Sequence, residues 1–167
     1  MSYQATETEI KRAELPHAIL LFDLIVVHVF GFVIGLGMIK SSYIPLMLMP
    51  VVSILLLSYI LFQANRAKTA EPSWFVRCHI MLAAKRARLF LLLFLVTGSF
   101  TAFMYFGGAQ FGLSKIASYS LAFGIGQLPF MVALLALVVL EYDASHQCKT
   151  GKIPAAAIAL HPAPTEA

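Results

Sequence analysis

Four long apolar stretches constrain this chain more than any other feature of its sequence. They cover residues 17–39, 44–63, 89–106 and 116–140. Each is long enough to cross a hydrocarbon layer of about 30 Å as an α-helix. Hydrophobic residues make up 60% of the 167 residues and charged residues only 12%, whereas soluble domains average about 45–50% and 25%. We therefore predict an all-α membrane protein, a bundle of four transmembrane helices.

The lysines and arginines predict the orientation of this bundle. Lys40 and Lys115 fall on one side of the four predicted spans, and the other ten fall on the opposite side. Because short cytoplasmic loops carry the excess of basic residues, both termini and the middle loop are expected in the cytoplasm. Basic residues beside apolar spans also fit contact with anionic membrane lipids, and they do not indicate a nucleic-acid partner.

This topology divides the chain into three parts. Residues 1–16 form a cytoplasmic N-terminal segment, residues 17–145 the membrane domain, and residues 146–167 a cytoplasmic tail rich in proline and alanine. The first span is not expected to be a secretory signal, because no small-residue cleavage site follows it. The tail has no core-forming pattern, so we expect it to be disordered. A bacterial inner membrane is the expected location.

The middle loop, residues 64–88, is predicted to contain a helix that extends the third span into the cytoplasm. Pro72 is well placed as a first helical residue, and no proline follows it before residue 106. Both sides of this segment are largely apolar, so it is expected to pack against its own bundle, the lipid interface or another subunit. The side chains predicted to contact lipid or a partner are Trp74, Arg77, Lys85, Arg86 and Arg88.

Two ionisable residues, Asp23 and His28, lie within the first span. Isolated charge is costly inside a membrane, so such residues suggest a functional site. At 3.6 residues per turn they lie roughly 140° apart around the helix, and they are not expected to form one site. For each, a hydrogen bond or ion pair with a neighbouring helix is the simpler interpretation. The alternatives for His28 are a proton or quinone role, or ligation of haem or a metal.

Small and polar residues in the first and fourth spans predict sites of helix packing. Gly31 and Gly35 form a GxxxG motif, which permits close helix approach or, alternatively, clears a slot for a planar ligand. In the fourth span, Gly124 belongs to the packing set and Pro129 predicts a kink. Gln127 needs a hydrogen-bond partner within the membrane. The candidates are His28, Thr97, Ser99 and Thr101.

A further group of residues meets at the cytoplasmic ends of the spans. Such His, Cys and carboxylate side chains can bind a transition metal, but no CxxC, HxxxH or HExxH spacing occurs. We therefore interpret the group as a chance gathering at the membrane surface and predict neither a metal site nor, in a reducing compartment, a disulfide. The group consists of His17, Cys78, His79, Glu141, Asp143, His146 and Cys148.

The sequence contains no motif that identifies a family or a reaction, and we predict no catalytic residue. Three hypotheses follow. The first is a non-catalytic subunit, or an assembly or stabilising factor, of a larger membrane complex, with other membrane subunits as partners. The second is a redox subunit that binds haem or quinone at His28. The third is a small transporter or channel with a polar path formed by Asp23, His28 and Gln127.

Overall fold

The computed structural model describes residues 3–38, 40–42 and 44–163, which are helical with short connections and contain no β-strand. Four of its helices are long and apolar enough to cross a membrane, which confirms the all-α prediction of four such segments. These helices are Glu7–Gly35, Ile44–Ala70, Trp74–Phe111 and Lys115–Lys149.

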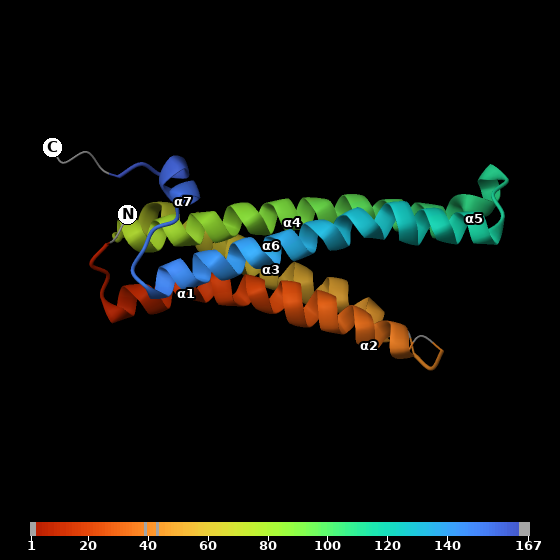
Figure 1. Ribbon diagram of the computed structural model, residues 1–167, viewed down its shortest axis with the longest axis horizontal. Helices are drawn as coiled ribbons and strands as arrows, with labels where there is room; N and C mark the ends of the chain where they lie inside the picture. Colours follow the sequence, from red (N-terminus) through yellow and green to blue (C-terminus); the bar gives the residue numbers. More distant parts are fainter. Residues whose placement is uncertain (1–2, 39, 43, 164–167) are drawn as a thin grey trace. The chain divides into compact units, whose positions relative to one another are not determined.

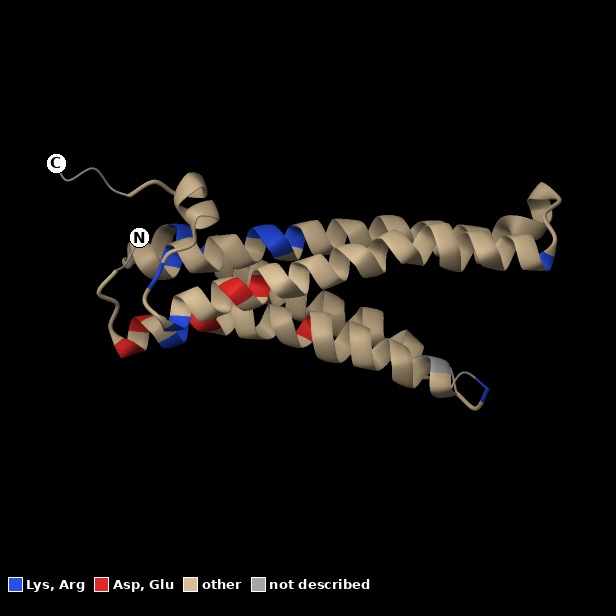
Figure 2. Cartoon of the chain, in the orientation of Figure 1, with Lys and Arg blue, Asp and Glu red and all other residues tan. Residues whose placement is uncertain are grey.

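The chain divides into two compact units. Unit 1 comprises Met1–Arg88 and Val138–Ala167, and unit 2 comprises Leu89–Leu137. Unit 2 contains a single charged residue, Lys115, so nearly all the charge of the chain belongs to unit 1. Within unit 1 the charged residues gather mainly in the part that carries the two termini (Figure 2).

The first membrane helix of unit 1 is built from three consecutive segments: α1 (Glu7–Phe22), η1 (Asp23–Phe30) and α2 (Gly31–Met38). A capping box starts α1, because Thr6 Oγ1 accepts from Glu9 N at 3.3 Å and Thr6 N donates to Glu9 Oε2 at 2.8 Å. The helix therefore begins well before the predicted span at residue 17. The η1 segment is a π-helix, whose turns are wider than those of an α-helix.

Unit 1 continues with α3 (Ile44–Ala70), the first part of α4 (Trp74–Gly107) and the last part of α6 (Leu128–Lys149). The first membrane helix lies beside α3 (Figure 1). Small side chains fill much of the core, which lets the helices approach closely. The fully or almost fully buried alanines of unit 1 include Ala13, Ala64, Ala83, Ala84, Ala87 and Ala144.

The long helix α4 confirms the predicted helical extension of the third span. It has 34 residues, more than the ~20 needed to cross a membrane, so residues 74–88 lie outside the predicted span. Phe75, Val76 and Ala83 are fully buried, and this segment therefore packs against its own unit. The predicted start at Pro72 is two residues too early, because Ser73 is the N-cap: its carbonyl oxygen accepts the first intrahelical bond, from Arg77 N at 3.0 Å, and its Oγ accepts from Val76 N at 3.5 Å.

The prediction of a disordered tail is wrong for the described residues 152–163. Ile153 and Ala157 are buried, and Ala155–Leu160 forms helix α7. The tail is held because Gly151, with a φ of 67°, turns the chain so that Gly151 O accepts from Tyr3 N at 2.8 Å. Composition alone did not reveal these contacts. Residues 164–167 lie outside the described part of the chain.

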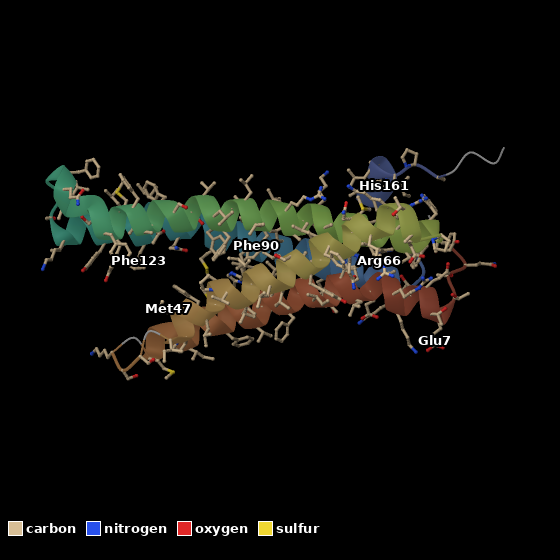
Figure 3. All side chains as sticks on the ribbon, turned by 180° about the vertical axis from the view of Figure 1, so that it is seen from behind. Glu7, Met47, Arg66, Phe90, Phe123 and His161 are labelled. Carbon is tan, nitrogen blue, oxygen red and sulfur yellow. The ribbon has the colours of Figure 1, made fainter. Side chains whose placement is uncertain are left out.

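Unit 2 is a helical hairpin. The remainder of α4 leads into η2 (Gly108–Phe111), a short 3₁₀ turn, and the chain returns through α5 (Lys115–Ser120), η3 (Leu121–Gln127) and the start of α6. Gly112 makes the turn possible with a φ of 72°. Large apolar side chains project from the helices of both units, as Met47 and Phe123 illustrate (Figure 3). Such surfaces suit a lipid environment.

Candidate functional site

Three buried ionisable side chains from three helices meet inside unit 1. His17 on α1 lies with Nδ1 2.5 Å from Glu141 Oε1 on α6, and its Nε2 lies 3.0 Å from His79 Nδ1 on α4. Each of the three is no more than 1% exposed. Arg86 Nη1 donates to Glu141 Oε2 at 2.7 Å. We call Arg86, Glu141, His17 and His79 the buried ionic chain.

The last bond of the buried ionic chain fixes where its protons lie. His79 Nε2 is 3.1 Å from the carbonyl oxygen of Lys152, and a carbonyl only accepts, so Nε2 carries the proton. In a neutral His79, Nδ1 must then accept, and His17 Nε2 donates to it. One further proton lies between His17 Nδ1 and Glu141. The guanidinium of Arg86 stabilises the carboxylate, so we assign this proton to His17 as an imidazolium.

Burial determines the net charge of the buried ionic chain. His79 lies outside the predicted spans, and burial, together with the positive charge of His17, lowers its pKa to about 4. His79 is therefore neutral near pH 7. Arg86 and His17 then face one carboxylate, and the buried ionic chain carries a net charge of +1. Burial of such a charged group costs free energy, and removal of one of its members strongly destabilises the fold.

The prediction of a chance gathering is therefore wrong for His17, His79 and Glu141. The remaining members of that predicted group do not join them. Burial raises the pKa of Cys78 to about 11 and that of Cys148 to about 12, so both thiols stay protonated and are poor metal ligands. Among the described residues, no group of three or more His, Cys, Asp or Glu side chains is placed to hold a metal ion.

A signal for the buried ionic chain was present in the sequence. His79 and Arg86 are seven residues apart, two helical turns, and so lie on one face of a helix. Glu141 directly follows an apolar span, and His17 is the first residue of another. The cross-helix partner of each could not be read from this spacing, because it depends on how α1, α4 and α6 pack.

A second polar site lies in the first membrane helix. The wide π-helical turn of η1 brings His28 to Asp23, five residues earlier: His28 Nδ1 donates to Asp23 O at 3.0 Å and lies 3.7 Å from Asp23 Oδ1. The expected 140° separation assumed an α-helix and is wrong. Ser53 on α3 donates to Asp23 Oδ2 at 3.0 Å. Asp23 is therefore tied to a neighbouring helix, with Oδ1 free of any hydrogen bond within the described chain.

The polar residue of the fourth membrane helix also has its partner. Gln127 Nε2 donates to Thr101 Oγ1 at 3.0 Å, and Thr101 Oγ1 donates to Ala122 O at 3.1 Å. Thr101 is thus the partner among the candidates that the sequence offered. The π-helix η3 ends two residues before Pro129, and the kink expected at Pro129 stays a prediction.

The glycines of the predicted packing set differ in their surroundings. A Cβ at Gly35 would collide with Leu46, and a Cβ at Gly31 would lie 3.7 Å from Met49 Sδ, so both glycines face α3. A Cβ at Gly124 would meet no described atom outside its own helix within 4 Å, whereas a Cβ at Gly126 would collide with Thr101. Within unit 2, close contacts therefore lie at Gly126 and at Gly108, where a Cβ would collide with Ser118.

The residues predicted to contact lipid or a partner have different environments. Lys85 and Arg88 are exposed. Trp74 and Arg77 are half-buried, and Trp74 Nε1 donates to His161 O at 3.2 Å. Arg86, with 13% of its side chain exposed, is bound to Glu141. At least one member of this set thus has its main partner within the chain.

Comparison of the chain with protein-family models, with curated proteins and with solved structures finds no match. The class of protein is therefore inferred from the fold and its buried polar sites. By length and composition, the four apolar helices indicate a multi-pass membrane protein.

Proposed function

We propose that this chain is a non-catalytic subunit, or an assembly or stabilising factor, of a larger membrane protein complex. The observation that carries the proposal is the complete hydrogen bonding of three members of the buried ionic chain. Every side-chain nitrogen and oxygen of His17, His79 and Glu141 already bonds to another group of the same chain. A group that binds or transforms a substrate needs an atom within reach of it. These side chains instead fasten helices together.

The open surface of unit 2 supports the same proposal. A Cβ built on Gly124 or on Gly98 would meet no described side chain or neighbouring helix within 4 Å, and Gly124 lies in the π-helix η3. Small residues on a membrane helix permit close approach of another helix. A second membrane protein could therefore pack closely against η3.

We place both termini of the protein in the cytoplasm of a bacterium, with the chain in the inner membrane. The uneven distribution of lysines and arginines supports this orientation. A partner outside the lipid would then meet unit 1, which holds nearly all the charge.

The test is purification in a mild detergent, followed by identification of the co-purifying chains. We expect the wild type to elute with a partner and the substitution Gly124→Leu to reduce its yield at least tenfold. Gly37→Leu is the matched control, because Gly37 is also exposed and a Cβ there would meet no described atom outside its own helix within 4 Å. A wild type that elutes as a single chain would refute the proposal. So would a Gly124→Leu variant that retains its partner in full.

One observation favours a second function, proton-linked transport. Asp23 is fully buried in the first membrane helix, and its Oδ1 lacks a hydrogen bond within the described chain. A carboxyl in this state can exchange a proton during transport. In vesicles containing a pH-sensitive dye, Asp23→Asn should abolish proton flux that the wild type and the exposed control Asp143→Asn support. No flux above that of empty vesicles would exclude this function. The redox hypothesis centred on His28 stays a prediction.

A further inference from the structure

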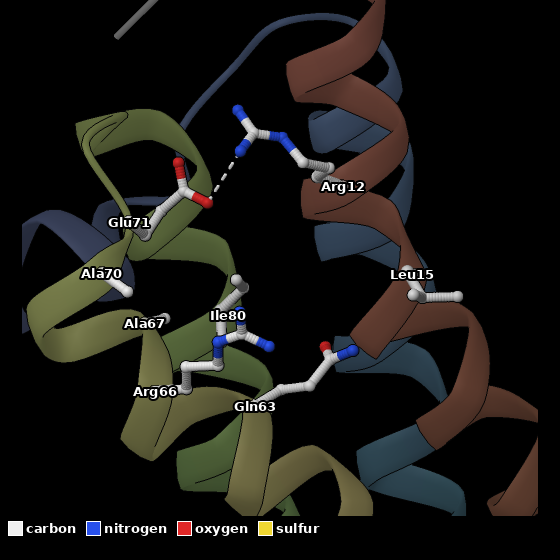
Figure 4. Close-up of a pocket in the computed structure, with 8 residues that line it drawn as sticks. All are labelled: Arg12, Leu15, Gln63, Arg66, Ala67, Ala70, Glu71 and Ile80. Carbon is white, nitrogen blue, oxygen red and sulfur yellow. Dashed lines mark hydrogen bonds and ion pairs between the residues drawn. The ribbon is translucent and has the colours of Figure 1, made fainter.

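A pocket of about 350 Å³ opens on unit 1 between α1, α3 and α4 (Figure 4). Four of its lining residues are polar or charged and four are apolar, so it can hold a ligand that combines both characters. The lining residues are Arg12, Leu15, Gln63, Arg66, Ala67, Ala70, Glu71 and Ile80.

The charges of this pocket do not cancel. Arg12 Nη1 lies 3.0 Å from Glu71 Oε2 and is neutralised by it. Glu71 is further held because its Oε1 accepts from Ser73 N at 3.1 Å. Arg66 forms no salt bridge with any described residue, and its guanidinium points into the pocket (Figure 4). The pocket therefore carries a net charge of +1, located on Arg66.

The position of the pocket indicates which kind of anion it can bind. Gln63 is the last residue of the predicted second span, and Arg66 follows about one helical turn later. This is the depth at which phospholipid headgroups meet the hydrocarbon. Ile80 lies beside the guanidinium, and Leu15 lines the opposite side of the pocket (Figure 4). A soluble anion would gain nothing from the apolar surface of these residues, whereas the glycerol and upper acyl chain of a lipid would bury it.

We propose that this pocket binds the phosphate of an anionic phospholipid headgroup, with Arg66 as the main ligand of the phosphate and Arg12 as a second donor. A guanidinium offers several N–H donors in a planar arrangement that matches phosphate oxygens. Basic pockets between membrane helices on the cytoplasmic side are suited to such lipids. This inference does not depend on the proposed subunit role.

The test measures stabilisation of the full chain by lipid in detergent. Dioleoylphosphatidylglycerol is titrated, and the apparent affinity is obtained from the rise of the unfolding temperature. Dioleoylphosphatidylcholine and inorganic phosphate serve as separate probes. We expect a saturable effect of phosphatidylglycerol on the wild type and an apparent affinity at least fivefold weaker for Arg66→Gln. Arg66→Lys should lose less. Lys11→Gln, an exposed charge outside the pocket, should match the wild type.

Three results would overturn the assignment. Equal stabilisation by phosphatidylglycerol and phosphatidylcholine would show that the headgroup charge is not recognised. An equal loss in Lys11→Gln and Arg66→Gln would mean that general charge, not the pocket, attracts the lipid. Full stabilisation by inorganic phosphate alone would identify a soluble anion as the ligand. Each variant is compared with its own unfolding temperature without lipid, so a change in folding cannot imitate a loss of binding.

Discussion

Replacement of Glu141 by glutamine should destabilise unit 1 severely. Glu141 is the only carboxylate of the buried ionic chain, and it accepts from both His17 and Arg86. A glutamine has nearly the same shape but only one oxygen, so its amide N–H₂ group must face one of these two donors. The substitution also removes the negative charge that offsets two buried cations.

The size of the effect follows from these contacts. Each of the two charge-assisted hydrogen bonds is worth about 1.5–3 kcal/mol, and removal of one partner from a buried ion pair costs about 3–5 kcal/mol. Arg86 keeps 13% of its side chain exposed, so water screens part of its charge and the lower end applies. We expect a loss of about 3 kcal/mol in the free energy of unfolding.

Denaturant titration of the purified protein in detergent, followed by circular dichroism, measures this loss. The matched control is Glu7→Gln, which breaks the exposed pair of Glu7 and Lys11 and should cost below about 0.5 kcal/mol. Adding Arg86→Met to Glu141→Gln should recover part of the stability, because the cation that faces the glutamine amide is then removed and the glutamine oxygen can still accept from His17. A Glu141→Gln variant within about 0.5 kcal/mol of the wild type would refute the reasoning.

Three further predictions concern the same unit. The pKa of His79 is about 4 in the folded protein and about 6.5 in an unfolded chain, so its contribution to the free energy of unfolding is complete above pH 6.5. This contribution is lost as the pH falls toward 4, and the unfolding temperature falls with it. The fall should be smaller in the His79→Gln variant. Ser53→Ala removes the hydrogen bond to Asp23 and should cost about 1 kcal/mol by denaturant titration. Ile153→Ala should loosen α7 and red-shift the fluorescence of Trp74, the single tryptophan; an unchanged spectrum would show that the tail does not cover it.

The fold was largely predictable, for a physical reason. A membrane span requires about 20 consecutive apolar residues, and this requirement is visible in one sequence without knowledge of tertiary contacts. The helix of residues 74–88 was predictable for the same kind of reason, since no breaker interrupts it. The helical start at Thr6 could also have been found, because Thr6 and Glu9 have the spacing of a capping box. The ordered tail could not, since its order depends on contacts with residues far along the chain.

The candidate sites were less predictable, because each depends on geometry between or within helices that the sequence leaves open. The proximity of Asp23 and His28 required a π-helix, whereas their spacing in an α-helix separates them. Likewise, His17 and Glu141 are 124 residues apart, and no local pattern pairs them. Thr101, by contrast, was found among a few candidates, because a buried Gln127 within lipid must have a partner.

Within the predicted spans 17–39 and 116–140, the two π-helical segments contain Asp23, His28 and Gln127, and this coincidence has a physical basis. A π-helical turn places residues five apart in register, so η1 can bring the imidazole of His28 to the backbone oxygen of Asp23 without a neighbouring helix. In η3, Gln127 reaches Thr101 while Ala122 O, five residues before Gln127, accepts from the same hydroxyl. Each wide turn therefore lets polar groups of one helix satisfy one another or share a partner. In a hydrocarbon environment, where an unsatisfied polar group is costly, this geometry lowers the cost of keeping a histidine, an aspartate and a glutamine within the spans.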